Sequence, residues 1–171
     1  MMYKVLVTGS AGFIGFHVVS RLLKKSQIHI IGLDSINDYY DISLKYGRLS
    51  EHGIECNQLT NSHKVYSKKY PNYTFFKGDI ADSCFMTKLF NQEKFDYVIH
   101  LAGQAGVRYS LTSPHEYITS NIQGFLNILE GVRHNRIKHL VYASTSSVYG
   151  LNTTVPFSEK LNAIVTANIS E

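Results

Sequence analysis

The stretch Val5–Gly15, VLVTGSAGFIG, joins an apolar run to three glycines spaced G-x-x-G-x-x-G. The run has the character of a buried strand, and helical periodicity follows it. In such a turn the first glycine allows a tight bend, the second lets a pyrophosphate approach the backbone, and the third lets helix pack on strand. Free N–H groups at the helix start favour phosphate. The stretch predicts a dinucleotide site that includes Gly9, Gly12, Phe13, Ile14 and Gly15.

Asp34 provides the second signal, because a glycine-rich turn alone is weak evidence. It ends the next apolar run, 19 residues after Gly15. An acid at that place would accept both ribose hydroxyls of the adenosine half and would repel a 2′-phosphate, which favours NAD over NADP. The competing interpretation of Asp34 is an ordinary helix cap.

Short β-branched runs alternate with helical-period segments along the chain, which predicts an α/β fold with a Rossmann-type, doubly wound parallel sheet. Strands buried on both faces are expected at Tyr3–Thr8, Gln27–Leu33, Tyr73–Lys77, Tyr97–Leu101 and Lys138–Ser144. Helices are expected at Phe13–Lys25, Ser83–Gln92 and Pro114–His134. The long polar stretch between Asp34 and Tyr73 predicts a helical excursion over the sheet edge, with a helix near Asp41–Glu51.

Two further strand ends carry candidate cofactor contacts. KGDIAD would bring Asp79 and Ile80 beside the adenine, and HLAGQAG has small residues that let a cofactor lie close to the backbone. Carboxyl ends of parallel strands meet at one edge of a sheet, so these segments would form a single site. The contacts expected from HLAGQAG are Leu101, Ala102, Gly103 and Ala105.

Composition narrows the class of protein. A chain of 171 residues with 44% hydrophobic residues can bury one core, and its charge of +4 is scattered, without the basic stripe of a nucleic-acid face. Cys56 and Cys84 lie 28 residues apart, and no histidine has metal-ligand spacing, so neither a disulfide framework nor a metal site is predicted. No apolar run approaches membrane-spanning length. A cytoplasmic protein without a membrane or nucleic-acid partner is expected.

With these motifs in hand, the chain resembles the extended short-chain dehydrogenase/reductase superfamily and, within it, the NAD-dependent nucleotide-sugar epimerases of the UDP-glucuronate 4-epimerase group. The resemblance is carried by VTGSAGFIGFHV, DSINDYYDISLK, HLAGQAGVRYS, SNIQGFLNILEG and LVYASTSSVYGLN. Two departures are Ser35, where the family usually has Asn, and residues 52–70, which look like a variable insertion.

The resemblance implies roles for the hydroxyl-rich stretch ASTSSVYG. Thr145 matches the residue that holds the reacting sugar oxygen, and Ser144 beside it would face the cofactor, as would Ser120. Ser146 and Ser147 would bind the sugar carboxylate, although small residues filling a crowded strand end are the alternative. Arg108 would anchor the anionic sugar nucleotide, or is a surface arginine near a loop. The implied reaction is oxidation of a UDP-sugar at C4, rotation of the keto sugar and return of hydride, converting UDP-glucuronate to UDP-galacturonate.

The family's tyrosine and lysine are not found where the resemblance places them. The tyrosine would fall at Asn168, Ile169 or Ser170, and no tyrosine follows Tyr149. The spacing Y-x-x-x-K does occur in Tyr73–Lys77, but on an expected strand, where residues four apart do not meet as they do on a helix. It is interpreted as a chance match.

Similarity stops after Glu159, so we expect residues 1–159 to form an incomplete NAD-binding Rossmann domain and residues 160–171 a tail foreign to the family. A truncated or frameshifted gene is the hypothesis, with the carboxyl-terminal substrate domain absent and the family's dimer-forming helix pair incomplete. Pro114–His134 would then expose an apolar face. The prediction is an epimerase portion that is inactive alone. The alternatives are a non-catalytic NAD-binding module or degenerate gene product, and a UDP-sugar dehydratase or decarboxylase relative.

Overall fold

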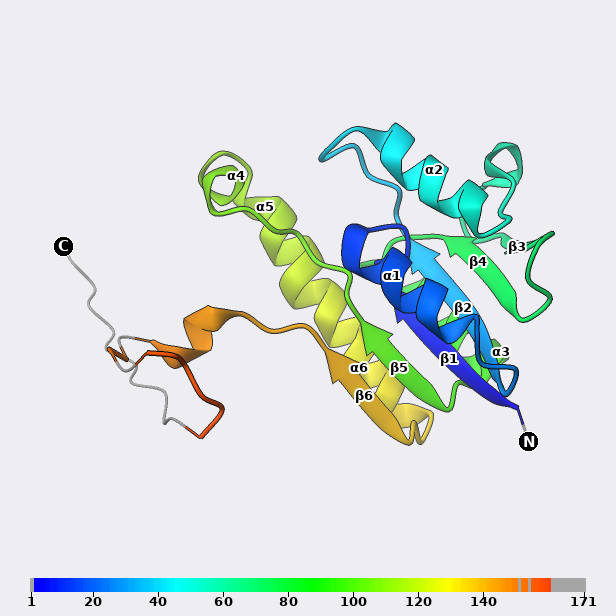
Figure 1. The fold of residues 1–171 in the computed structure, drawn as a ribbon. Helices are drawn as coiled ribbons and strands as arrows, with labels where there is room; N and C mark the ends of the chain where they lie inside the picture. Colours follow the sequence, from blue (N-terminus) through cyan, green and yellow to red (C-terminus); the bar gives the residue numbers. More distant parts are fainter. Residues whose placement is uncertain (1, 151, 154, 161–171) are drawn as a thin grey trace.

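The computed structural model describes residues 2–150, 152–153 and 155–160 (Figure 1). The strands are β1 (Tyr3–Thr8), β2 (Ile28–Asp34), β3 (Lys64–Tyr66), β4 (Tyr73–Lys77), β5 (Tyr97–His100) and β6 (His139–Tyr142). The α-helices are α1 (Phe13–Leu22), α2 (Ile42–Glu51), α3 (Ser83–Glu93), α4 (Val107–Thr112), α5 (Pro114–Tyr117) and α6 (Phe125–His134). Two 3-10 turns, η1 (Cys56–Gln58) and η3 (Ser146–Tyr149), and a π-helical segment, η2 (Ile118–Gly124), complete them.

The strands form one sheet in the order β3-β4-β2-β1-β5-β6. Every pair is parallel except β3 with β4. The chain leaves β1 toward β2 on one side and later returns to β5 on the other, so the strand order reverses between β1 and β5. In an open α/β sheet the ligand crevice lies at this reversal, outside the carboxyl ends of the strands. The predicted Rossmann-type sheet is confirmed.

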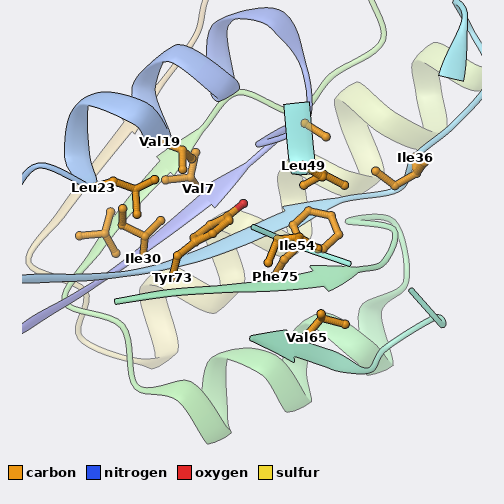
Figure 2. Packing of buried hydrophobic residues seen from close by; sticks show 12 residues of the cluster. Val7, Val19, Leu23, Ile30, Ile36, Leu49, Ile54, Val65, Tyr73 and Phe75 are labelled. Atoms are coloured by element: carbon orange, nitrogen blue, oxygen red, sulfur yellow. The ribbon is translucent and has the colours of Figure 1, made fainter. Parts of the chain in front are cut away.

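Helices cover both faces of the sheet because its central strands are apolar on both sides. Val5 and Val7 of β1 point to the face covered by α1 and α2, whereas Leu6 points to the face covered by α3 and α6. In Figure 2, Val19 and Leu23 lie over the sheet, and Leu49 and Ile54 cover its other end. The second face is closed by a different set of buried side chains, which includes Phe85, Met86, Leu89 and Phe90 of α3 and Ile128 of α6.

The Asp34–Tyr73 excursion has the expected helix, and Asp41 caps it by accepting a hydrogen bond from Ser43 N at 2.9 Å. The excursion also holds a strand that the sequence did not predict, β3. Its three residues are too few to show an alternating pattern, and they pair antiparallel with the outer side of β4.

The last helix and the last strand differ from expectation. Pro114–His134 is not one uniform helix, because the wider turn η2 separates α5 from α6, and an unpredicted short helix, α4, precedes it.

β6 was expected to be buried on both faces, but Val141 and Tyr142 are 50% and 52% exposed. The reason is its place at the edge, where β5 is its only paired strand among the described residues. The predicted foreign tail lies almost wholly outside the described residues.

Candidate functional site

The glycine turn between β1 and α1 has the geometry that its spacing predicts. Gly9 has a positive φ of +68°, and a Cβ there would lie 2.7 Å from Ala102 N, so only glycine permits both the bend and the contact with the segment after β5. A Cβ on Gly15 would lie 2.1 Å from Gly9 O, which shows how closely α1 packs on the turn. Gly12 precedes α1, and no side chain caps the helix start. Its first N–H groups therefore remain available to an anion.

Asp34, at the end of β2, is buried and held in place by backbone amides. Its Oδ2 accepts from Ala11 N at 3.1 Å in the glycine turn, and its Oδ1 accepts from Ile36 N at 2.9 Å. These bonds fix the carboxylate beside the turn, where the sequence analysis expects the adenosine ribose. These contacts do not support the alternative that Asp34 is an ordinary helix cap, because the next helix, α2, is capped by Asp41.

A buried lysine beside Asp34 was not predicted. Lys45 Nζ lies 3.5 Å from Asp34 Oδ1, with both side chains 6% exposed, and it donates to Asn37 Oδ1 at 2.6 Å. The pair offsets the carboxylate charge on which the expected preference for NAD over NADP depends. Lys45 belongs to the segment DSINDYYDISLK, one helical turn into α2, and it reaches back over the loop to Asp34. The sequence shows the lysine, but it does not show that its side chain points toward Asp34.

β1 and β5 are linked at their carboxyl ends by Thr8 and His100. Thr8 Oγ1 lies 2.7 Å from His100 Nδ1 and accepts from the backbone N–H groups of Leu101 and Ala102, both at 3.2 Å. His100 stacks on Phe125 at a centroid distance of 5.3 Å, and burial lowers the pKa of its imidazole to about 4. The segment after β5 is thereby fixed against β1.

The same segment is held from the other side by α5 and η2. Asn121 accepts from Gln104 N at 2.8 Å and donates to Gln104 O at 2.9 Å, the pairing that a neighbouring strand would make. Tyr117 donates to Ala105 O at 2.8 Å. Tyr39, from the loop after β2, packs on Tyr109 of α4 at a centroid distance of 5.0 Å. The loops after β2 and β5 therefore touch across the sheet edge.

These elements enclose a cleft, here called the main cleft, at the carboxyl edge of the sheet. Ten of the predicted cofactor residues line it: Gly9, Gly12, Asp34, Asp79, Ile80, Leu101, Ala102, Gly103, Ala105 and Ser120. Eight other lining residues were not predicted individually: Leu33, Ser35, Asn37, Tyr39, Tyr40, Lys45, Gly78 and Gln104.

A second, more open hollow, here called the hydroxyl cleft, continues from the main cleft and shares the segment after β5. Its lining includes Ser144, Thr145 and Ser147 together with His100, Phe125 and Tyr142. Thr145 precedes η3, where its Oγ1 accepts from Ser147 N and lies 3.3 Å from Ser147 Oγ. The chain thus places three of the four predicted hydroxyls beside the main cleft.

Five predicted site residues lie away from the lining of both clefts. Phe13 and Ile14 are 68% and 59% exposed at the start of α1, and Gly15 is buried beneath the glycine turn. Arg108 is exposed on α4, and Ser146 is exposed in η3. Phe13 and Ile14 can still contribute backbone N–H groups, since they form the uncapped first turn of α1.

Tyr73 and Lys77, the only Y-x-x-x-K pair of the chain, lie on β4 as expected. Tyr73 is 1% exposed within the core in Figure 2, and burial raises the pKa of its hydroxyl well above its ordinary value. Buried in the core, this hydroxyl cannot contact a substrate in either cleft.

Other kinds of site find little support among the described residues. They contain no group of three or more side chains that could hold a metal ion, and none of their helices has the length and apolarity needed to cross a membrane. Cys56 and Cys84 are both free.

Comparison with known proteins identifies the family. The model of the NAD dependent epimerase/dehydratase family matches residues 5–170. UDP-glucuronate 4-epimerase 3 of Arabidopsis thaliana is 46% identical over 159 residues, which are 92% of this chain and 33% of that protein. Protein CapI of Staphylococcus aureus is 47% identical over 159 residues, 93% of this chain and 42% of its own.

Solved structures agree with the sequence matches. UDP-glucuronic acid 4-epimerase from Bacillus cereus, in complex with UDP-glucuronic acid and NAD, has a TM-score of 0.75 at 33% identity, covering 94% of this chain and 46% of that one. UDP-glucose 4-epimerase from Bifidobacterium longum, in complex with NAD+ and UDP, has a TM-score of 0.72 at 27% identity, covering 95% and 43%. The chain spans less than half the length of these relatives.

Proposed function

Because this chain belongs to the NAD dependent epimerase/dehydratase family, we propose that it is the NAD-binding portion of a UDP-sugar 4-epimerase that acts on UDP-glucuronate. One observation carries the proposal: the main cleft gathers the glycine turn, Asp34 and the segments after β4 and β5 at the reversal between β1 and β5.

The residues of the main cleft fit a dinucleotide. The glycine turn leaves the start of α1 uncapped for the pyrophosphate, and an added Cβ at Gly12 would meet only Gly9 O, at 3.1 Å, so the space beyond it is open. Asp34 would hold the adenosine ribose, and Asp79 and Ile80 would flank the adenine. Leu101 and Ala102, fixed by Thr8, would lie along the nicotinamide half. When bound, NAD would supply reversible hydride transfer.

The hydroxyl cleft would receive the sugar. Thr145 would hold the reacting oxygen by hydrogen bonding, with Ser144 toward the cofactor and Ser147 and Ser146 toward the carboxylate of a glucuronate. Arg108 would pair with the diphosphate only if α4 turned toward the cleft. Oxidation of a glucuronate at C4 gives a β-keto acid, so serines that hold the carboxylate would also oppose loss of CO₂.

The cofactor proposal is tested by calorimetry of the 171-residue chain with NAD and NADP. We expect NAD to bind more tightly, because Asp34 faces the ribose hydroxyls. Absence of heat at millimolar NAD would refute cofactor binding, and tighter binding of NADP would show that Lys45 outweighs Asp34.

Turnover is tested separately with UDP-glucuronate and NAD. We infer that the chain alone binds without epimerising, because no tyrosine follows Tyr149 and the only Y-x-x-x-K pair lies on β4, where Tyr73 is buried. Formation of UDP-galacturonate above the no-enzyme background would contradict this.

A non-catalytic NAD-binding module is therefore the second candidate function for the isolated chain. A dehydratase relative is less favoured, since Ser146 and Ser147 stand where those relatives usually carry an Asp-Glu pair.

A further inference from the structure

The turn after β4, residues 78–82, contributes Gly78, Asp79 and Ile80 to the lining of the main cleft and is held by hydrogen bonds from the sheet and from the helix. From the sheet side, Gly78 N donates to Asp34 O at 3.0 Å. Within the turn, Asp79 Oδ1 accepts from Ala81 N at 2.8 Å. From the helix side, two side-chain amides reach its backbone carbonyls: Asn127 Nδ2 donates to Ile80 O at 2.8 Å, and Gln123 Nε2 donates to Ala81 O at 3.0 Å.

The helix also contacts this turn through its backbone. A Cβ added to Gly124 would lie 2.6 Å from Ile80 Cδ1, so the isoleucine rests directly on the junction between η2 and α6. Ile80 and Ala81 are 6% and 9% exposed, so water has little access to replace a lost partner of their carbonyls. Gln123 and Asn127 are four residues apart, the spacing that stacks side chains on one helical face, with Gly124 between them.

The side chains of η2 and α6 hold two different segments that line the main cleft, the one after β5 and the one after β4. Asn121 holds Gln104, after β5, whereas Gln123 and Asn127 hold the turn after β4. One continuous element, remote from the glycine turn in sequence, therefore sets the separation of two walls of the main cleft. A π-helical turn is rare and is frequently found at functional sites, which agrees with this placement.

We propose that Gln123 and Asn127 are positioning residues for the adenosine end of the cofactor cleft, acting through the carbonyls of Ala81 and Ile80 to hold Asp79 and Ile80 in place. The inference rests on the proposed binding of NAD. Neither amide lines the main cleft, so their effect on affinity is indirect.

The test replaces each amide donor by an oxygen of the same shape, in Asn127→Asp and Gln123→Glu. The carboxylate repels the carbonyl that the amide held, so the turn is released. We expect calorimetry to show affinity for AMP reduced about tenfold, and affinity for NAD reduced by the same factor. Asn135→Asp is the matched control, because Asn135, the C-cap residue of α6, makes its side-chain hydrogen bond to Gly131 O and none to the turn after β4. It should bind both ligands as the unchanged chain does.

Hydrogen exchange in the absence of ligand separates this inference from the NAD proposal. In both variants the amides of residues 79–82 should exchange faster, while those of β1 and β2 stay protected. Unchanged exchange in this turn, or unchanged affinity for AMP in both variants, would overturn the inference. If the unchanged chain binds neither AMP nor NAD, the proposed function fails, but the exchange comparison still decides whether the amides hold the turn. Gln123→Glu keeps the test available if Asn127→Asp fails to fold, because Gln123 is exposed.

Discussion

At the scale of single residues, the main cleft is organised around the carboxylate of Asp34. It accepts from the glycine turn and from its own loop, and it faces the Lys45 ammonium at 3.5 Å. A buried ion pair is sensitive to the loss of one partner, because the remaining charge stays desolvated. Changes at Asp34 should therefore affect both cofactor choice and stability.

The Asp34→Asn variant tests that role in binding. Its amide keeps the shape but loses the negative charge, so we expect NAD affinity to fall about tenfold to a hundredfold. The relative affinity for NADP should rise, because Lys45 is no longer neutralised. Calorimetry with both cofactors measures the ratio. Asp38→Asn, an exposed acid of the same loop, should change neither, and an equal loss in that control would contradict a specific role for Asp34.

Two buried histidines predict how stability depends on pH. Burial, with a smaller contribution from Lys69, lowers the pKa of His52 to about 4, and burial lowers the pKa of His100 to about 4. Both pKa values lie below that of an unfolded histidine, about 6.5, so the unfolded state binds protons first as pH falls. The stability present above about pH 6.5 should decline toward pH 4, by about 1–3 kcal/mol for each histidine.

Urea unfolding at a series of pH values measures this decline, and the His52→Phe variant isolates one contribution. Phenylalanine can keep the stacking on Phe16, whose ring centroid lies 4.6 Å from that of His52, but it cannot titrate. The variant should lose less free energy of unfolding between neutral and acidic pH than the unchanged chain. Equal losses would mean that His52 does not contribute.

At the scale of elements, the glycine turn shows why its three glycines are not equivalent. Gly12 borders open space, whereas Gly15 is in contact with Gly9 O, and helix α1 can approach β1 only because Gly15 has no side chain. The third glycine is therefore a packing requirement, whereas the second leaves the space that the proposed dinucleotide would occupy.

Gly15→Ala should destabilise the fold by about 2–3 kcal/mol, because its methyl group would lie 2.1 Å from Gly9 O and the helix must move. The matched control is Gly47→Ala on α2, where an added Cβ meets nothing within 4 Å. There alanine should stabilise by about 0.5–1 kcal/mol through its better helix propensity. Thermal unfolding of both variants checks the opposite signs, and destabilisation by both would contradict the packing argument.

Elements with a strong pattern could be predicted from the sequence, and elements defined by tertiary contacts could not. β1, β4 and α3 were predicted to within a residue because apolar periodicity defines them locally. β3 has only three residues and exists because it pairs with β4. The π-helical turn η2 has no distinct composition. The amide contacts of Gln123 and Asn127 depend on it, so no sequence pattern pointed to them.

The residues of the candidate site also differ in whether the sequence could predict them. Residues at strand ends, such as Gly9, Asp34 and Asp79, were predicted because the carboxyl edge of a parallel sheet brings them together. Lys45 and Tyr39 reach the main cleft from the excursion after β2, whose path over the sheet depends on packing. Roles assigned through the family resemblance, including that of Thr145, stay predictions until binding and turnover are measured.

At the scale of the whole molecule, one side is markedly apolar. Ile118, Ile122, Leu126 and Leu129 recur every three or four residues along η2 and α6, and they are 54%, 60%, 55% and 40% exposed. The neighbouring edge strand β6 exposes Val141 and Tyr142 as well. Exposed apolar side chains that follow one another along a helix in this way favour association in water.

Sedimentation of the 171-residue chain should therefore show association that increases with concentration. The double substitution Ile122→Lys with Leu126→Lys should shift the population toward the monomer, because two ammonium groups cannot be buried in an apolar contact. Leu44→Lys, at a leucine 52% exposed on α2, is the control and should leave association unchanged. A monomer at every concentration for the unchanged chain would contradict the prediction.

The contact between Thr8 and His100 also indicates which nitrogen of the His100 imidazole carries the proton. A threonine hydroxyl has one hydrogen and two lone pairs, and Thr8 Oγ1 already accepts from the N–H groups of Leu101 and Ala102. We therefore expect its hydrogen to point to His100 Nδ1, which would leave the neutral imidazole as the Nε2–H tautomer. The positions of heavy atoms thus specify a nitrogen-15 spectrum for this ring, with Nδ1 at the chemical shift of a bare, pyridine-like nitrogen and Nε2 at that of a protonated one.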